Sequence, residues 1–217
     1  MQNYKTTFFK LALKHEVLRF GSFTLKSGRV SPYFFNLGRI ASGGALRELA
    51  HAYADAILAS GLEFDLLFGP AYKGIPLAAA VACALAERGR DLPFAYNRKE
   101  AKDHGEGGVL VGAEVSGKRV LIVDDVLTAG TALRESHGLL VRAGALPIAA
   151  ITALDRQEVG PNGRGAVAEL VENIKISVIS LVTVQDLLLY LQGSDGDQAT
   201  IAAIQAYQAR YGVPASA

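Results

Sequence analysis

The stretch from Val120 to Thr131 contains the residues best suited to chemistry. A continuous apolar run, Val120–Val123, is followed by the adjacent acids Asp124 and Asp125, and then by the small and hydroxyl residues of Thr128–Thr131. Ionised carboxylates only accept hydrogen bonds, so they suit two neighbouring sugar hydroxyls, which donate them. The free backbone N–H groups and the dipole at the start of a following helix suit a phosphate. A phosphate beside a diol describes a ribose 5-phosphate.

An ordinary turn that caps a helix is the alternative interpretation of this stretch. Such a turn explains one of the two acids but not the other, because adjacent like charges repel each other. Gly130 lets the backbone approach a ligand closely. The hydroxyls of Thr128 and Thr131 add hydrogen-bond donors. We therefore favour the ligand site.

A second loop, Gly69–Gly74, joins an expected strand to an expected helix. It presents backbone N–H groups and one cation, Lys73, to an anion. A plain strand–helix turn explains the loop equally well, so it gains weight only beside the other loops.

A third loop, Asn97–Gly112, is long, cationic and rich in glycine. Its cations fall within seven residues and are Arg98, Lys99, Lys102 and His104. A connection of this length is usually functional or disordered, and cations on a mobile loop can close over an anionic ligand. Nearby acids offset much of the charge, so a solvated surface loop is the alternative.

Together these loops resemble the type I phosphoribosyltransferases. The Asp-Asp strand end with Thr-Ala-Gly-Thr resembles the phosphoribosyl pyrophosphate (PRPP) motif of that family. The lysine-rich loop and the Phe-Phe strand narrow the resemblance to the orotate phosphoribosyltransferases. The matching segments are Phe23–Arg29, Ser31–Asn36, Gly69–Pro76, Asn97–Gly107, Val120–Thr131 and Asp155–Glu158.

The resemblance implies transfer of ribose 5-phosphate from PRPP to N1 of orotate, which gives orotidine 5′-monophosphate and pyrophosphate in pyrimidine (UMP) biosynthesis. It also implies a Mg²⁺-dependent pentosyltransferase that works as a homodimer, in which part of the mobile loop reaches the neighbouring subunit's site. Mg²⁺ usually keeps several waters and is held largely by substrate oxygens. We therefore expect no direct metal ligand from the chain.

The resemblance also assigns roles to individual residues. The catalytic residues it implies are Lys26, Lys99, Lys102, His104 and Asp125. The PRPP-binding residues it implies are Lys26, Tyr72, Lys73, Arg98, Lys99, Lys102, His104, Asp124, Asp125, Val126, Leu127, Thr128, Ala129, Gly130, Thr131 and Ala132. The orotate-binding residues it implies are Phe34, Phe35, Thr128 and Arg156.

These roles fit the chemistry of the reaction. Pyrophosphate leaves with growing negative charge while C1 of the ribose becomes oxocarbenium-like, so catalysis is mainly charge stabilisation and exclusion of water. Arg156 can pair with the carboxylate of orotate. Phe34 and Phe35 can form an apolar wall for its ring, although successive strand residues face opposite ways and one of them can be ordinary core.

Two other functions are weighed against this one. A transferase of the same superfamily that acts on a purine would leave Arg156 and the Phe pair unexplained. A non-catalytic regulator that senses PRPP would need a DNA-binding module, and the stretch before Phe23 is too short and too weakly basic for one.

Alternating helices and strands must position these loops, which predicts an α/β fold with a mostly parallel central sheet flanked by helices. In such sheets ligands bind at the carboxyl ends of the strands. We expect an N-terminal helix and a small covering segment, the hood, over residues 1–40. The α/β core is expected over residues 41–217 and contains the mobile loop 97–112. Ser42 and Thr183 are expected helix N-caps. The segment 159–167 and the C-terminal tail show no usable motif.

Composition argues against several other classes of protein. The 217 residues include 22 Lys and Arg against 21 Asp and Glu, so the net charge of +1 gives no broad basic footprint for nucleic acid. The single cysteine, Cys83, lies in an apolar run and is expected to be a core residue. The longest apolar run, Ile75–Ala86, is shorter than the roughly 20 residues of a membrane span. We expect a cytoplasmic protein with small-molecule substrates and neither nucleic-acid nor membrane partners.

Overall fold

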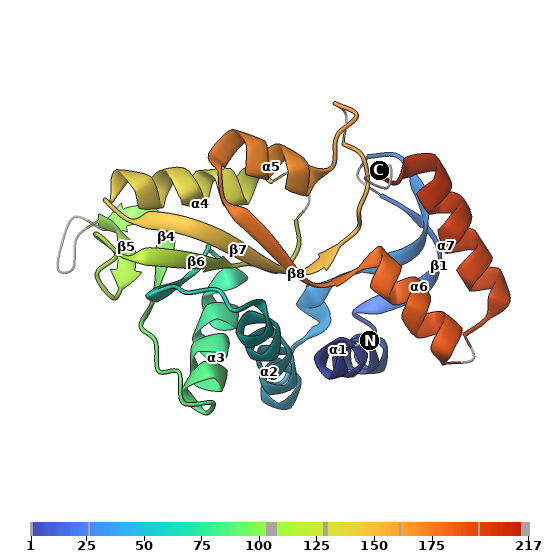
Figure 1. The fold of residues 1–217 in the computed structure, drawn as a ribbon, viewed down its shortest axis with the longest axis horizontal. Coiled ribbons are helices and arrows are strands. Elements are labelled where there is room, and N and C mark those ends of the chain that lie inside the picture. The colour runs from blue at the N-terminus through green and yellow to red at the C-terminus, as the bar shows by residue number, and fades with distance from the viewer. Residues whose placement is uncertain are drawn as a thin grey trace.

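The fold is built around a six-stranded sheet, seen edge-on in Figure 1. The computed structural model describes residues 2–25, 27–102, 108–127, 130–160, 162–194 and 196–213. The side chains of residues 99–102 lie outside this description as well. In spatial order the strands are β5 (Gly108–Gly112), β4 (Phe94–Lys102), β3 (Leu66–Gly69), β6 (Arg119–Val123), β7 (Leu146–Asp155) and β8 (Ser177–Thr183). Only β5 pairs antiparallel, so the predicted mostly parallel sheet is confirmed.

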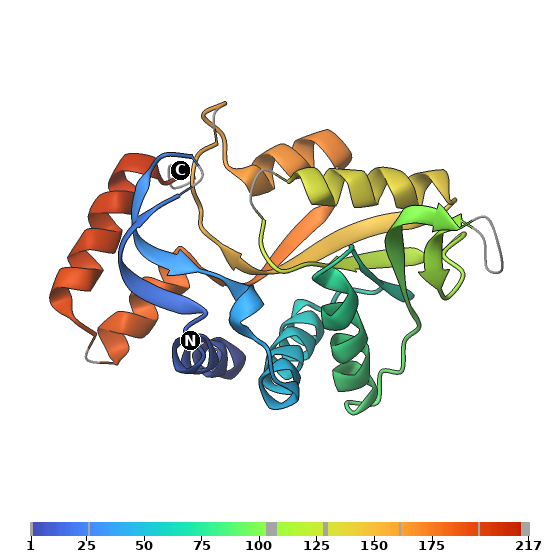
Figure 2. The ribbon, with the colours of Figure 1, turned by 180° about the vertical axis from the view of Figure 1, so that it is seen from behind.

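Helices cover both faces of this sheet (Figures 1 and 2). One face carries α2 (Gly43–Ser60) and α3 (Gly74–Ala86), and the other carries α4 (Thr131–Arg142) and α5 (Ala166–Ile174). The central strand β6 therefore needs apolar side chains on both sides. Its residues alternate between the two cores, which places Leu121 and Val123 with α2 and α3, and Val120 and Ile122 with α4 and α5.

A two-stranded antiparallel sheet beside the main one forms the hood, which consists of β1 (Leu18–Thr24) and β2 (Val30–Phe35). The helix α1 (Asn3–Lys14) precedes it, and a short 3-10 helix, η1 (Leu37–Arg39), leads from it to α2. The expected N-terminal helix and hood are thus present.

Of the two C-terminal helices, α7 (Gln198–Tyr211) packs on the hood strand β2, while α6 (Val184–Gly193) contacts α1, α7 and the end of β8 (Figure 1). The ring of Tyr207 on α7 meets Tyr33 of β2 edge-on, with 6.5 Å between centroids. On α6, Asp186 accepts hydrogen bonds of 2.9 Å from Lys5 of α1. The two ends of the chain therefore build one substructure.

Local signals behave largely as predicted, but Cys83 on α3 is exposed and the prediction of a core residue there is wrong. Ser42 caps α2 by accepting from the N–H of Ala45, and Thr183 and Asp186 form a capping box at the start of α6. The expected loop 97–112 needs correction, because β4 continues to Lys102 and pairs with β5 from Gly108 onward. The helix α5 begins inside the segment 159–167, in which the sequence shows no usable motif.

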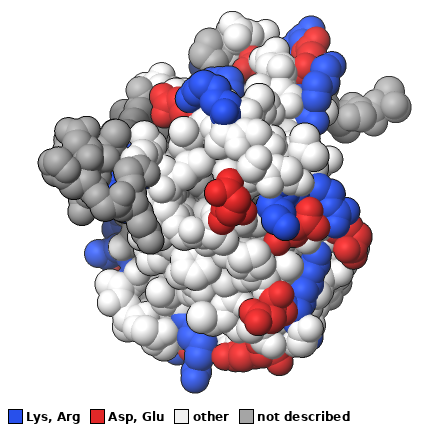
Figure 3. Space-filling view, turned by 90° about the vertical axis from the view of Figure 1, so that its left-hand side faces the viewer, with Lys and Arg blue, Asp and Glu red and all other residues white. Residues whose placement is uncertain are grey.

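The surface carries a mixture of charges. Figure 3 shows that acids and bases are interspersed, with much uncharged surface between them, on the end of the molecule that lies at the left of Figure 1. Within the described ranges, none of the helices has the length and apolarity that crossing a membrane requires.

Candidate active site

The two acids follow β6 on a backbone that is fixed from both sides. The N–H of Asp124 donates to the carbonyl of Ile151, and the N–H of Ala153 donates to the carbonyl of Asp125. The hydroxyl of Tyr53, fully buried on α2, donates to the carbonyl of Asp124 at 2.9 Å. The positions of both carboxylates are therefore set by β7 and α2.

The carboxylate of Asp125 has partners on each oxygen. Its Oδ1 accepts from the N–H of Val126, and its Oδ2 lies 2.7 Å from Nζ of Lys73. The structure thus brings together two predicted site residues from loops that lie far apart in sequence. A mostly apolar pocket adjoins this ion pair, and its other lining residues are Leu37, Gly38, Ile40, Leu46, Leu49, Pro76 and Leu77. The Asp125 side chain is only 13% exposed, whereas the Lys73 side chain is 60% exposed and can reach a ligand.

Asp124 occupies a different electrostatic environment. Burial and the neighbouring charge of Asp125 raise its pKa to about 6, although the backbone N–H of Asp125 and the charge of Lys73 lower it. Its Oδ1 accepts from that N–H at 2.8 Å. The pair can accept hydrogen bonds from a diol most strongly when both carboxyls are ionised.

The helix α4 follows these acids along the chain. Gly130 is its N-cap and has a φ of +69°, a conformation that favours glycine. In the described residues no side chain caps this end, and its first turn holds no acid. Its N–H groups are therefore available to an anion. Thr131 and Ala132 are exposed there, whereas Thr128 and Ala129 lie outside the described residues.

The loop Gly69–Gly74 passes close to the same strand end. A Cβ atom on Gly74 would lie 2.6 Å from Cδ of Pro70 and 3.0 Å from the carbonyl oxygen of Val123. Only glycine fits there, and this close approach puts Lys73 within reach of Asp125. Tyr72 is 64% exposed, which suits a residue that meets a ligand rather than the core.

The strand β4 supports that loop from the other side. The side chain of Asn97 accepts from the N–H of Ala71 at 3.0 Å. The next residue, Arg98, has a buried Nη1 atom without a hydrogen-bond partner among the described residues. A buried guanidinium donor of this kind is available to an anionic ligand. The side chains of Lys99 and Lys102, and the whole of His104, lie outside the described residues.

The two phenylalanines of β2 point to opposite faces of the hood. The ring of Phe34 lies 5.5 Å from Phe23, while the ring of Phe35 lies 6.2 Å from Phe8 in the core. Successive strand residues face opposite ways, so only Phe34 is turned away from that core. Lys26, which is expected at the hood turn, lies outside the described residues.

Arg156 follows β7 and bridges this strand to the hood. Its Nε donates to Glu158 at 2.6 Å, and its Nη2 donates to the hydroxyl of Ser31 at 3.1 Å. Its guanidinium carbon lies 4.3 Å from the ring centroid of Tyr33. An arginine held in this way presents a fixed donor edge to a carboxylate.

Sequence reasoning missed several supporting residues. Ser31 and Glu158 lie inside segments that match the family, so their neighbourhood was a usable signal. Tyr53 lies in a helix without any motif, and only its hydrogen bond across 71 positions reveals its role.

Comparison with known proteins agrees with this geometry. Residues 38–186 match the model of the phosphoribosyl transferase domain. An orotate phosphoribosyltransferase of Cellvibrio japonicus is 55% identical over 98% of this chain and 99% of its own length. One from Stenotrophomonas maltophilia is 54% identical over 98% of both chains.

The fold of a solved relative matches as well. The crystal structure of orotate phosphoribosyltransferase from Francisella tularensis superposes with a TM-score of 0.87 at 41% identity, and covers 94% of this chain and 98% of that one. Because the similarity spans both the hood and the core, it exceeds what the shared domain alone explains. The chain belongs to the orotate phosphoribosyltransferases, within the family of the phosphoribosyl transferase domain.

Proposed function

We propose that this chain transfers ribose 5-phosphate from PRPP to N1 of orotate, which gives orotidine 5′-monophosphate and pyrophosphate for pyrimidine synthesis. The observation that carries the proposal is the ion pair of Asp125 with Lys73 next to Asp124, followed along the chain by a start of α4 that no described side chain caps. The similarity to orotate phosphoribosyltransferases over nearly the whole chain supports it.

The donor occupies the strand ends in this proposal. Asp124 and Asp125 accept hydrogen bonds from the ribose hydroxyls. The 5′-phosphate binds the N–H groups and hydroxyls at the start of α4, in the segment 126–132. The pyrophosphate lies against Tyr72, Lys73 and Arg98. The buried Nη1 of Arg98, which has no hydrogen-bond partner among the described residues, supports the last assignment.

The chemical step is then mainly electrostatic. As the C1–oxygen bond of the donor breaks, negative charge grows on pyrophosphate, and Lys73 is placed to stabilise it. The loop cations Lys99, Lys102 and His104 add positive charge and exclude water when they cover the site. Lys26 acts at the same centre from the hood.

The acceptor lies between the hood and the end of β7. Arg156 pairs with the carboxylate of orotate, Thr128 contacts the ring, and Phe34 forms its apolar wall. Phe35 contributes through its backbone in this arrangement, because its ring packs toward Phe8. A purine offers no carboxylate, so the fixed guanidinium of Arg156 favours orotate as the acceptor.

Magnesium fits the donor set. Among the described residues no group of three or more His, Cys, Asp or Glu side chains could hold a metal ion. Mg²⁺ would instead be held mainly by the oxygens of the donor and by water, next to the carboxylates of Asp124 and Asp125 that accept from the ribose hydroxyls. The ion would supply further positive charge to the departing pyrophosphate.

The proposed enzyme is a cytoplasmic homodimer whose subunits share the cationic loop. The similarity to orotate phosphoribosyltransferases supports this assignment, and β4 carries the cationic segment from Asn97, beside the loop after β3, to Lys102. The β4–β5 hairpin lies at the end of the molecule opposite α7 (Figures 1 and 2).

An ultraviolet assay with PRPP and Mg²⁺ tests the proposed reaction. Orotate should be consumed and orotidine 5′-monophosphate should form, while uracil and hypoxanthine should react at least about 100-fold more slowly, because each lacks the carboxylate that Arg156 binds. Transfer to hypoxanthine without transfer to orotate would make the chain a purine enzyme. Binding of PRPP without transfer to any acceptor would make it a sensor.

A further inference from the structure

The guanidinium of Arg156 is held on three sides. Glu158 accepts from Nε at 2.6 Å, Ser31 accepts from Nη2 at 3.1 Å, and the ring of Tyr33 lies under the plane. The side chains of Arg156 and Glu158 are only 19% and 14% exposed. The side chain of Tyr207 on α7 also interacts with the guanidinium of Arg156. The group is therefore held in one orientation, while part of the side chain stays exposed to a ligand.

Glu158 is shared between two arginines. Its second oxygen lies 3.4 Å from Nη1 of Arg29, whose Nη2 donates to the carbonyl of Val159 at 2.9 Å. Arg29 also lies over the ring of Tyr211, at 4.7 Å from its centroid. Contacts with the hood and α7 therefore fix the side chain of Glu158. Because Glu158 is fixed, it can hold Arg156 in one orientation.

We propose that Glu158 is a positioning residue. It holds Arg156 in the orientation that receives the carboxylate of orotate. This inference rests on the proposed function, in which Arg156 binds that carboxylate. A free arginine loses rotamer entropy when it binds a ligand, whereas an arginine already held in place loses little. Glu158 thus acts on the affinity for the acceptor and leaves the donor site unaffected.

A merely structural role for Glu158 makes a different prediction. The backbone of Glu158 pairs with Gly212, and Val159 donates to the carbonyl of Tyr211, so this segment also ties α7 to the hood. If Glu158 served only this connection, its loss would lower the melting temperature and disturb both substrates together. A rise in the KM for orotate without a rise in the KM for PRPP therefore distinguishes the positioning role from the structural one.

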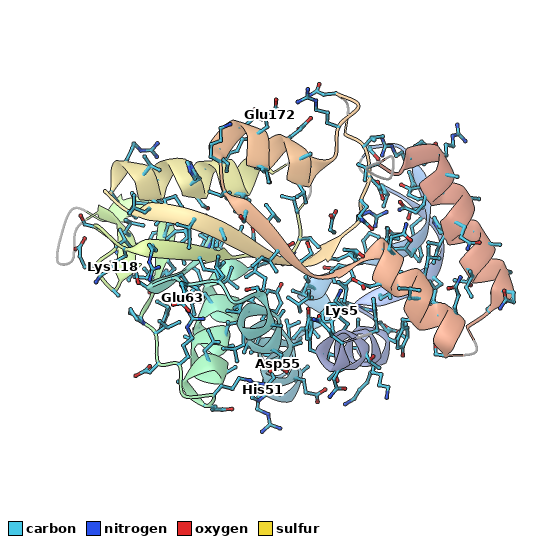
Figure 4. All side chains as sticks on the ribbon, in the orientation of Figure 1. Lys5, His51, Asp55, Glu63, Lys118 and Glu172 are labelled. Carbon is cyan, nitrogen blue, oxygen red and sulfur yellow. The ribbon has the colours of Figure 1, made fainter. Side chains whose placement is uncertain are left out.

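The first experiment compares Glu158→Gln with a matched control, Glu172→Gln. Glu172 also pairs with an arginine, Arg164, but both side chains are more than half exposed, and Glu172 projects from the outer side of α5 (Figure 4). We expect Glu158→Gln to raise the KM for orotate about tenfold and the KM for PRPP less than twofold, because the negative charge that strengthens the hydrogen bond from Arg156 is lost. The control should change neither value by more than about twofold. Equal rises in both KM values would overturn the proposal.

The second experiment is a double-mutant cycle with Arg156→Ala. If Glu158 acts through Arg156, Glu158→Gln should raise the KM for orotate no further in the Arg156→Ala background. An additive rise would overturn the proposal and leave the proposed function standing. If Arg156→Ala itself failed to raise the KM for orotate selectively, the assigned role of Arg156 would fall, and this inference with it. A wild-type chain without transferase activity would instead overturn the proposed function.

A second variant covers the case in which Glu158→Gln does not fold. Ser31→Ala removes the other side-chain partner of the guanidinium. It should raise the KM for orotate about threefold with the KM for PRPP unchanged, because a hydrogen bond with one charged partner is lost. No selective change in this variant would overturn the proposal that Arg156 must be held in place.

Discussion

The ionisation of Asp124 is costly in the folded protein. Burial and the charge of Asp125 raise the pKa of this carboxyl to about 6, against an ordinary value of 3.8. Tyr53 and Lys73 are its other polar neighbours, and neither removes the cost. A group whose pKa is raised on folding stabilises the fold below its unfolded pKa, and that contribution disappears as the pH rises through the folded pKa. The donor site is thus maintained at the expense of stability at neutral pH.

Asp124→Asn is therefore expected to stabilise the protein above pH 6. The amide keeps an oxygen for the N–H of Asp125 but carries no charge. The free energy of unfolding should exceed that of the wild type by about 2–3 kcal/mol at pH 7.5, and by much less at pH 4. Urea denaturation at both values measures the difference, and PRPP binding should weaken because a hydroxyl acceptor is lost.

Asp65→Asn provides a control of opposite sign. Hydrogen bonds from Arg119 lower the pKa of Asp65 to about 2. The ionised Asp65 therefore stabilises the fold above pH 3.8, and this stabilisation is lost as the pH falls through 2. The variant should be slightly destabilised at neutral pH. A pH-independent effect of Asp124→Asn would contradict the assigned pKa.

At the scale of elements, α7 joins the hood to the acceptor site. Tyr207 packs on Tyr33, which itself lies under Arg156, and Gln208 donates to the carbonyl of Arg156 at 3.1 Å. The carbonyl of Tyr211 accepts from the N–H of Val159. A C-terminal helix without a sequence motif thus supports the residue expected to bind orotate.

Tyr207→Ala should therefore affect stability and acceptor binding together. Removing this 6% exposed ring leaves a cavity, which should lower the free energy of unfolding by about 3 kcal/mol. The KM for orotate should rise more than the KM for PRPP, because the support of Arg156 is lost. Leu189→Ala on the neighbouring helix α6, at a 60% exposed site, should change stability by less than about 0.5 kcal/mol. A loss of stability with unchanged KM values would show that α7 does not contribute to substrate binding.

The sequence predicts elements well where local signals are strong. Ser42, the capping box at Thr183 and the apolar run of β6 all work locally, and the structure confirms them. The strand β5 was missed because Gly108 and Gly112 at its ends resemble loop residues, and only pairing with β4 makes it a strand. Contacts such as Ser31 with Arg156 span 125 positions and leave no local pattern. Sequence therefore identifies the loops of the site but not the residues that support them.

At the scale of the whole molecule, the family resemblance implies that two subunits share the cationic loop. Lys102→Ala should lower turnover about 100-fold or more, because a charge that stabilises the leaving group is lost. The melting temperature should change little, since β4 pairs with β5 through its backbone at this position. Initial rates and thermal denaturation measure the two effects, and a large drop in melting temperature would assign Lys102 a structural role instead.

Mixing two inactive variants tests whether the loop acts across the dimer. In a mixed dimer of Lys102→Ala and Asp125→Asn subunits, one site would receive both defects and the other would receive neither. Random pairing makes about half of the dimers mixed, so activity should recover to roughly one quarter of the wild-type value. Each variant mixed with itself provides the baseline. If verified mixed dimers stay inactive, the loop covers the acids of its own chain, and the continuation of β4 beyond Asn97 turns back to its own site.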